Sequence, residues 1–270
     1  METGLSMATD SGNDSYELAN MDDETRRDKS GEKNRRCEHI FKEYVQPCVA
    51  ELISVMLFVI IGSISAISGS VVAVAFAHGL MIFVLISSIG QISGGHINPA
   101  VTLTVALSGG IPPLKALAYV VSQVLGSIIG AATVRAFLTH TLYEAISGGA
   151  VLIPNAEVSA GQAIYMETIM TMVLTMVVIF SAVDDKTKNL MAPLAIGMSI
   201  AACVYGGGML SGGCLNPGRA IGPAIVSGHW KNHYVFWIGP LLGALCTALL
   251  HRLVLGSSDQ RIFPKFGNED

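Results

Sequence analysis

The sequence predicts an all-α polytopic membrane protein with six transmembrane helices and two re-entrant half-helices in an inverted repeat. Three observations lead to this class. The 270 residues are 51% hydrophobic and 13% charged, whereas a soluble domain carries about 25% charged residues. Six apolar stretches reach the roughly 20 residues that a helix needs to cross a bilayer. The phrase Ser-Gly-Gly-x-x-Asn-Pro occurs twice, at 93–99 and 211–217.

The first 43 residues differ in composition from the remainder. They hold 18 of the 36 charged residues, whereas 44–256 holds only 13. A polar, charged segment with few aromatic residues is typical of disorder, and its first 30 residues contain no apolar stretch of the kind a signal peptide needs. We therefore predict a disordered tail at 1–43, a membrane domain at 44–256 and a C-terminal tail at 257–270.

Full spans and half-spans can be separated by their length. Two apolar pieces, Pro99 to Ser108 and Pro217 to Val226, have ten residues each and are too short to cross. Gly and Pro residues end the first, and Ser227-Gly228-His229 ends the second. The full spans are predicted at 44–67, 72–91, 114–138, 161–183, 190–209 and 233–255.

The two halves of the chain repeat one plan. Residues 44–138 and 161–256 each contain three spans, with a half-span between the second and the third. Because three is odd, the second half must enter the membrane from the opposite side, as in proteins with an inverted repeat. Lysine and arginine lie in the tails and in the 184–189 connection but not in 139–160. This distribution predicts that both termini are cytoplasmic.

Asn98 and Asn216 are predicted to begin the two half-helices. Asn is a good N-cap, and Pro fits the first helical position. The inverted repeat makes the two helix starts face each other near the membrane centre. We expect the glycine pairs before them (Gly94 with Gly95, Gly212 with Gly213) to run extended, with carbonyl oxygens lining a path.

Two opposed helix N-termini produce a positive potential at this central point. With two asparagine amides there, a water molecule turns its oxygen toward them, and cations meet a barrier. Arg219 lies in the same apolar segment, where a charge is costly and marks a functional site. The alternative for Arg219 is a side chain that extends to the membrane interface.

Glu51 and Glu167 occupy equivalent positions in the first span of each half. We expect each carboxylate to accept backbone N–H groups of the irregular loop in its own half. A proton relay through the two acids is the alternative.

Cys214 and His96 occupy equivalent positions before the two asparagines. Cys214 is predicted to face the path, where mercury would react with it, or else to be a small buried residue. His96 lines the inner vestibule or bonds to neighbouring backbone. The five cysteines have no metal-site spacing and are interpreted as free thiols. No metal, cofactor or nucleic-acid partner is expected.

These residues together resemble the major intrinsic protein family over about 44–256. The resemblance depends on the two Asn-Pro boxes, the trailing Arg219, the symmetric glutamates and the six spans. The segments "YVQPCVAEL", "AHGL", "SGGHINPAV", "DDKTKNLMAPLAIG" and "SGGCLNP" look like the aquaporin-8-like branch. The resemblance implies the aquaporin fold, with 44–256 as the channel domain, and a homotetramer in a lipid bilayer with one passive water pore per subunit.

The resemblance also implies an outer constriction made by His78, Val204, Gly213 and Arg219. Valine and glycine leave more room there than larger residues would, so ammonia and hydrogen peroxide are expected to pass along with water. His78 as an ordinary core histidine is the alternative. The second box reads Asn-Pro-Gly, and Gly218 is interpreted either as a tolerated variation or as a roomier pore midpoint.

Other functions are less well supported by the residues. A glycerol or urea facilitator is the alternative within the channel class, and a coupled secondary transporter is the alternative outside it. No Gly-x-Ser-x-Gly or His-Glu-x-x-His motif occurs, so no enzyme is expected. The plasma membrane is the expected location, with intracellular and mitochondrial membranes as alternatives.

Overall fold

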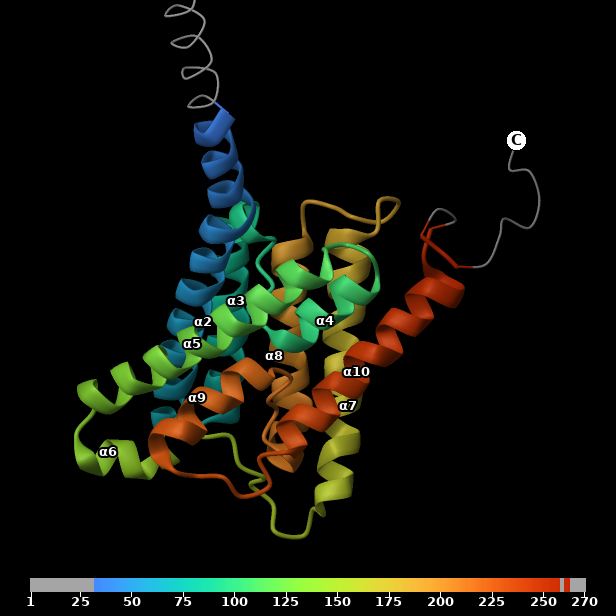
Figure 1. Ribbon diagram of the computed structural model, residues 1–270. Coiled ribbons are helices and arrows are strands. Elements are labelled where there is room, and N and C mark those ends of the chain that lie inside the picture. Colours follow the sequence, from blue (N-terminus) through green and yellow to red (C-terminus); the bar gives the residue numbers. More distant parts are fainter. Residues whose placement is uncertain (1–31, 258–259, 263–270) are drawn as a thin grey trace, which may run out of the picture. The chain divides into compact units, whose positions relative to one another are not determined.

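The computed structural model describes residues 32–257 and 260–262, and these residues form helices and loops without a β-strand. The chain divides into two units, of which the second begins at Gln46. The helices of the second unit (Figure 1) are α2 (Gln46–Ser65), α3 (Val71–Ser93), α4 (Pro99–Leu107), α5 (Pro113–Phe137), α6 (His140–Ala145), α7 (Ala160–Val178), α8 (Ala192–Ser211), α9 (Pro217–Ser227) and α10 (Val235–Leu250).

In the first unit the described residues are helical, which differs from the disorder predicted for 1–43. Residues 32–40 form an α-helix, which is followed by a π-helix, η1 (Phe41–Val45). The segment is rich in Glu, Lys and Arg, which favour helices, and Lys42 bonds Glu38 one turn earlier at 2.7 Å. Residues 1–31 of the predicted tail lie outside the described residues.

The six predicted spans are confirmed. Six helices of the described residues are long and apolar enough to cross a membrane. Two of them, α7 and α10, end in wider π-helical turns, η4 (Ile179–Val183) and η5 (His251–Leu255). The short helix α6 was not expected, and Thr139 caps its first turn.

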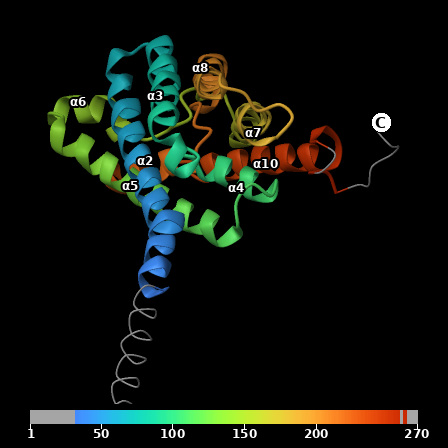
Figure 2. The same cartoon turned by 90° about the horizontal axis from the view of Figure 1, so that it is seen from above.

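The long helices pack in the order that an inverted repeat requires. Within each half, the first helix packs on the third, so α2 contacts α5 and α7 contacts α10. The two halves meet where α3 packs on α8. Viewed from above, α2, α3, α8 and α7 follow one another across the bundle (Figure 2).

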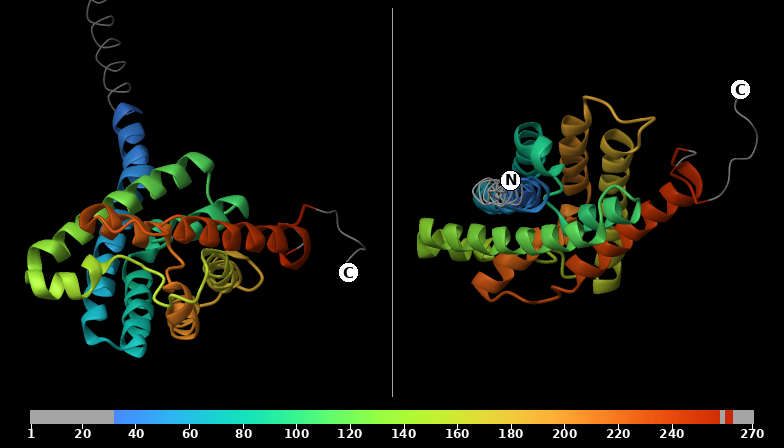
Figure 3. Two further views of the ribbon diagram at one scale, coloured as in Figure 1. Left: turned by 90° about the horizontal axis from the view of Figure 1, so that it is seen from below. Right: turned by 45° about the horizontal axis from the view of Figure 1, so that its top comes forward.

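The half-helices α4 and α9 cross from one half of the bundle to the other. The α4 helix packs against α10 of the second half, and α9 packs against α5 of the first half (Figure 3). Each half-helix is therefore held mainly by a long helix of the opposite repeat. This exchange brings the two Asn-Pro corners to one place.

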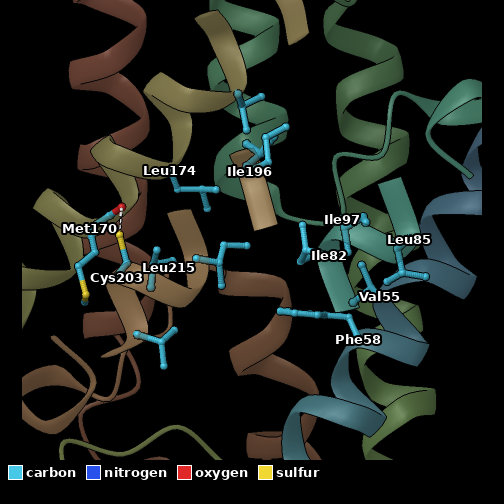
Figure 4. Packing of buried hydrophobic residues seen from close by; sticks show 14 of the residues in the cluster. Val55, Phe58, Ile82, Leu85, Ile97, Met170, Leu174, Ile196, Cys203 and Leu215 are labelled. Carbon is cyan, nitrogen blue, oxygen red and sulfur yellow. Dashed lines mark hydrogen bonds between the residues drawn. The ribbon is translucent and has the colours of Figure 1, made fainter. Parts of the chain in front are cut away.

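The buried core surrounds these corners. Ile97 and Leu215, the residues immediately before the two asparagines, are fully buried in the main hydrophobic cluster. Figure 4 shows both among side chains of α2, α3, α7 and α8, with the Cys203 thiol donating to the Met170 carbonyl at 3.5 Å. Packing on both loops thus fixes the backbone that leads into each half-helix.

Candidate functional site

The two Asn-Pro corners begin the half-helices as the sequence predicts. Asn98 is the N-cap of α4, and its side-chain oxygen accepts the N–H of Ala100 at 2.8 Å. Asn216 is the N-cap of α9, and its side-chain oxygen accepts the N–H of Arg219 at 3.1 Å. A proline follows each asparagine at the first helical position, where its missing N–H costs nothing.

The corners also bind each other directly. The Asn98 amide donates to the carbonyl of Leu215 at 2.9 Å, and the Asn216 amide donates to the carbonyl of Ile97 at 2.9 Å. Each amide has two N–H donors, so one is used to join the corners and one remains for the cavity. The sequence predicts that the two amides face the same point, but it does not predict this reciprocal pair of bonds.

The glycines before the corners are not extended, and that expectation is wrong. Gly94, Gly95, Gly212 and Gly213 all have positive φ angles, between 63° and 106°. Gly94 and Gly212 end α3 and α8 as left-handed C-caps, a position that glycine occupies without the steric cost of a Cβ atom. The chain therefore turns sharply at each corner.

Glu51 holds the first loop. One carboxylate oxygen accepts the Ser93 hydroxyl at 2.6 Å and the His96 N–H at 2.9 Å. The other accepts the Ile97 N–H at 2.7 Å. Glu51 is fully buried, and a buried carboxylate is tolerated only with such hydrogen bonds.

Glu167 makes the same set of bonds in the second half. Its oxygens accept the Ser211 hydroxyl at 2.7 Å, the Cys214 N–H at 2.9 Å and the Leu215 N–H at 2.8 Å. The two serines were not singled out from the sequence, although both repeated phrases begin with one. Their hydroxyls are the third ligand of each carboxylate.

The first half contains one further partner that the second half lacks. Gln123 of α5 donates to Glu51 at 2.8 Å and to Thr102 at 2.9 Å. When residues 119–130 are aligned with 236–247 of the second half, the counterpart of Gln123 is Pro240 of α10, which has no N–H donor. Gln123 was not predicted as a site residue, and its function in the site becomes visible only in the fold.

One cavity of about 630 Å³ is lined by residues of both halves of the molecule. Both asparagines line it, together with residues from α3, α7 and α8. Among the predicted site residues, the lining includes His78, Gly94, Gly95, His96, Asn98, Val204, Gly213, Cys214 and Asn216. Gly212 and Arg219 are not among its lining residues.

His78 lines the cavity from α3. Its Nδ1 bonds the Val74 carbonyl one turn earlier at 2.8 Å, and its ring meets the Phe58 ring edge-on. A Cβ atom added to Gly62 of α2 would lie 2.5 Å from its Nε2. The absence of a side chain at Gly62 therefore makes room for the imidazole.

Arg219 is buried and has a definite partner. Its guanidinium donates to the carbonyl of Gly149 at 2.6 Å, and only 7% of the residue is exposed. Gly149 lies in a short 3-10 turn, η3 (Ser147–Gly149), of the connection before α7. The bond holds the guanidinium inside the protein, which differs from the interfacial side chain that was the alternative.

His96 and Cys214 line the cavity at equivalent places. The Nδ1 of His96 lies 3.1 Å from the Thr102 hydroxyl, and its ring meets Tyr119 edge-on. The Cys214 thiol donates to the Asn216 carbonyl at 3.1 Å. Within the described part of the chain, no group of His, Cys, Asp and Glu has the arrangement of a metal site.

Gly218 faces the other corner and not the cavity. A Cβ atom added there would lie 2.9 Å from Cδ of Pro99 and 3.2 Å from the side-chain oxygen of Asn216. The proline ring cannot rotate away. The missing methyl group therefore lets the two half-helices approach closely, which neither sequence interpretation of Gly218 anticipated.

Comparisons with a family model and with known proteins identify the same family. Residues 39–251 match the model of the major intrinsic protein family. Aquaporin-8 of Mus musculus is 39% identical over 229 residues, which cover 83% of this chain and 88% of the mouse protein. Aquaporin TIP1-2 of Zea mays is 39% identical over 223 residues, which cover 76% of this chain and 84% of the maize protein.

A solved structure has the same fold. The aquaglyceroporin from Plasmodium falciparum superposes with a TM-score of 0.68 at 22% identity, covering 78% of this chain and 97% of that one. At this identity the similarity shows the shared fold alone. It confirms six membrane helices with two half-helices in an inverted repeat.

Proposed function

The chain belongs to the major intrinsic protein family, and from this we propose that it is a passive transmembrane channel for water that also conducts ammonia and hydrogen peroxide. The single observation that carries the proposal is the cavity that both Asn-Pro corners line. The relatives of this chain include aquaporins of animals and plants.

Exclusion of ions follows from the corners. The N-termini of α4 and α9 meet there, each equivalent to about half a positive charge. The remaining amide donors of Asn98 and Asn216 bind the oxygen of a passing water molecule. Its hydrogens then point away from the centre on both sides, so a proton cannot pass from water to water, and a cation meets positive potential.

The proposed outer constriction consists of His78, Val204, Gly213 and Arg219. Three of them line the cavity, and the guanidinium of Arg219 is buried nearby in the same bundle. Valine and glycine give this end little bulk, and His78 adds a polar surface. Small neutral molecules with hydrogen-bonding groups suit such an opening, whereas glycerol lacks an aromatic wall for its carbon chain.

Glu51 and Glu167 support the proposal because both carboxylates have a structural role. Each is saturated by N–H and O–H donors of its own loop. A coupled transporter would need ionisable groups that exchange protons or bind sodium ions. The two acids instead hold the loops open, which fits passive flow.

Assembly and location belong to the same proposal. We expect a homotetramer with one pore per subunit, the channel domain at 44–256, and both termini in the cytoplasm of a cell whose plasma membrane contains the protein. The lysines and arginines of the tails and of the 184–189 connection support this orientation.

Reconstituted vesicles test the function. Wild-type vesicles should shrink much faster than protein-free vesicles under an osmotic gradient, carry no ion current, and become alkaline inside when ammonia is added. Water flow no faster than through bare lipid would overturn the proposal. Flow that requires a sodium or proton gradient would favour a coupled transporter, and rapid glycerol uptake would favour the facilitator.

A matched pair of variants connects the flow to the cavity. Val204→Trp places a large ring in the cavity and should abolish water and ammonia flow. Val173→Trp makes the same change on α7, at a residue that is 42% exposed on the outer face, and should leave both flows unchanged. Equal flow through the two variants would show that water and ammonia do not pass through this cavity.

A further inference from the structure

A second buried polar cluster adjoins the cavity, whose lining includes its sequence neighbours Val183, Asp185 and Arg252. Its centre is Asp184, which directly follows the π-helix η4 and is 1% exposed. Its carboxylate accepts the Lys186 N–H at 3.0 Å and the Ser257 N–H at 3.0 Å. The Nε2 of His251 lies 3.2 Å from the same oxygen that binds Ser257.

These three contacts join three separate segments. Lys186 belongs to the connection between α7 and α8, His251 begins η5 at the end of α10, and Ser257 follows η5. Both long helices change from α to π geometry at this cluster, with the Asp184 N–H bonded to Ile179 at 2.8 Å and the Gly256 N–H to His251 at 2.9 Å. Single π turns are rare and occur often at functional sites.

Arg252, the neighbour of His251, lines the cavity. Ser108, Gly109, Arg252 and Gln260 line it together, and we call these four residues the Arg252 mouth. A Cβ atom added to Gly109, at the end of α4, would lie 3.7 Å from the Arg252 guanidinium. The chain also returns to this arginine, because the Ile262 N–H donates to the Arg252 carbonyl at 2.9 Å.

We propose that Arg252 forms a second narrow point of the pore at the Arg252 mouth, and that Asp184 is the positioning residue that holds it there. The inference rests on the proposed function, because it assigns a specificity-determining residue to the same permeation path. The path is then bounded by a buried arginine near the His78 end and by Arg252 at the opposite end.

The physical argument starts from the cost of a buried carboxylate. An ionised Asp away from water is costly unless it is paired and hydrogen-bonded, and Asp184 obtains its bonds by joining separate segments. Glu51 and Glu167 hold the half-helix loops, whereas Asp184 contacts neither loop. What it fixes is the base of Arg252 and the segment after η5. An arginine side chain has many rotamers, and a fixed backbone at Arg252 keeps the region that those rotamers can reach at the same place in the pore.

Substituted cysteines test the position of the mouth. Arg252→Cys and, separately, Gln260→Cys are reconstituted and treated on both sides of the vesicle with a bulky, charged methanethiosulfonate reagent. Each labelled variant should lose most of its water permeability, whereas the treated wild type and Arg261→Cys should not. Arg261 is the matched control, because it is exposed and does not line the cavity.

The two proposals fail in different ways. If vesicles with unlabelled wild type conduct no water, the proposed function is overturned, and this inference with it. If they conduct water and labelled Arg252→Cys and Gln260→Cys lose no more permeability than the controls, only this inference is overturned.

A second pair of variants tests Asp184 as a positioning residue. In the Arg252→Cys protein, Asp184→Asn should reduce the fraction of water flow that labelling blocks, because the bonds to His251 and Ser257 are weakened. Glu157→Gln removes one negative charge from an exposed residue that does not line the cavity, and should keep the full block. An undiminished block in Asp184→Asn, even with lower thermal stability, would show a merely structural role and overturn the assignment.

Discussion

At the scale of single residues, the geometry of the site depends on contacts between the two Asn-Pro corners. Asn98 and Asn216 each cap their own helix and donate to the opposite loop. One amide group thus performs two functions, because it carries an acceptor and two donors. Gly218 permits this arrangement by leaving space for the ring of Pro99.

Gly218→Ala should lower the stability of the protein. Alanine gains up to about 1 kcal/mol of helix propensity, but a methyl group 2.9 Å from the Pro99 ring forces the corners apart, and overpacking costs about 1–3 kcal/mol. Thermal unfolding of the purified protein in detergent measures the difference. Gly206→Ala on α8, where an added Cβ meets nothing within 4 Å, should leave the midpoint unchanged or raise it. A raised midpoint in Gly218→Ala would contradict the crowding argument.

Cys214→Ser should remove inhibition by mercury. The thiol lies on the cavity wall, so a bound mercury atom would obstruct the path, and serine offers no sulfur to bind it. Water flow with and without mercuric chloride is the measurement. Cys246→Ser, at an exposed cysteine of α10, is the control and should remain sensitive. Inhibition that persists in Cys214→Ser would assign the mercury site to another cysteine.

At the scale of elements, each irregular loop depends on one carboxylate from a neighbouring helix. Glu51 of α2 and Glu167 of α7 bind the same three kinds of donor: a serine hydroxyl and two backbone N–H groups. The loops turn too sharply to satisfy these donors themselves. Membrane helices tolerate such broken backbone only where the protein supplies the missing partners.

Glu167→Gln should destabilise the protein more than Glu51→Gln does. Either amide leaves a buried N–H unpaired, at a cost of about 1–3 kcal/mol. In the first half, Gln123 can turn its unpaired side-chain oxygen toward the new NH₂ group, whereas Pro240 offers nothing in the second half. Thermal unfolding compares the variants, and Gln123→Ala should abolish the advantage of Glu51→Gln. If Glu51→Gln and Glu167→Gln lose equal stability while Gln123 is still present, this account is contradicted.

The contribution of Asp184 to stability should depend on pH. Burial alone would raise the pKa of this carboxyl, but the hydrogen bonds from Ser257, Lys186 and His251 outweigh burial and lower it. Because the folded pKa lies below the ordinary value of 3.8, the stabilisation is complete above that value and is lost as the pH falls through the folded pKa. The difference in unfolding midpoint between wild type and Asp184→Asn should therefore shrink in acid. A difference that grows in acid would reverse the sign.

At the scale of the whole molecule, the inverted repeat depends on close helix contacts at equivalent places. Added Cβ atoms on Gly126 of α5 and Gly243 of α10 would overlap with the carbonyls of Leu52 and Thr168, the residues directly after Glu51 and Glu167. Between the halves, α3 and α8 meet where Gly79 and Gly197 face each other's carbonyl oxygens. Small residues let helices in membranes approach this closely.

Gly197→Ala should prevent correct joining of the two halves. Its methyl group would overlap with the Gly79 carbonyl, and a backbone atom cannot move aside without displacing α3. We expect little folded protein by size-exclusion chromatography. Gly208→Ala, on the same helix with ordinary contacts of 3.6 Å, should give a normal yield. Normal yield from Gly197→Ala would show that the helices are not held this tightly.

Much of this fold could be predicted because its rules are local. Apolar runs of about 20 residues give the spans, Asn-Pro gives the starts of α4 and α9, and an odd number of spans per half gives the inversion. The expectation of extended glycines failed because φ depends on where α3 and α8 must end. Gln123 and the two serines were missed because a polar residue acquires its function from a partner distant in the chain.

The sequence by itself determined the number of spans, the repeat, the two helix caps and several of the residues that line the cavity. Only the tertiary structure decided which donors face the cavity, why Gly218 is small, and that Arg219 is held by the Gly149 carbonyl. It alone brought Asp184, His251 and Ser257 together beside Arg252. The reason is physical: periodicity and capping act over a few residues, whereas these contacts require distant segments to be packed against each other.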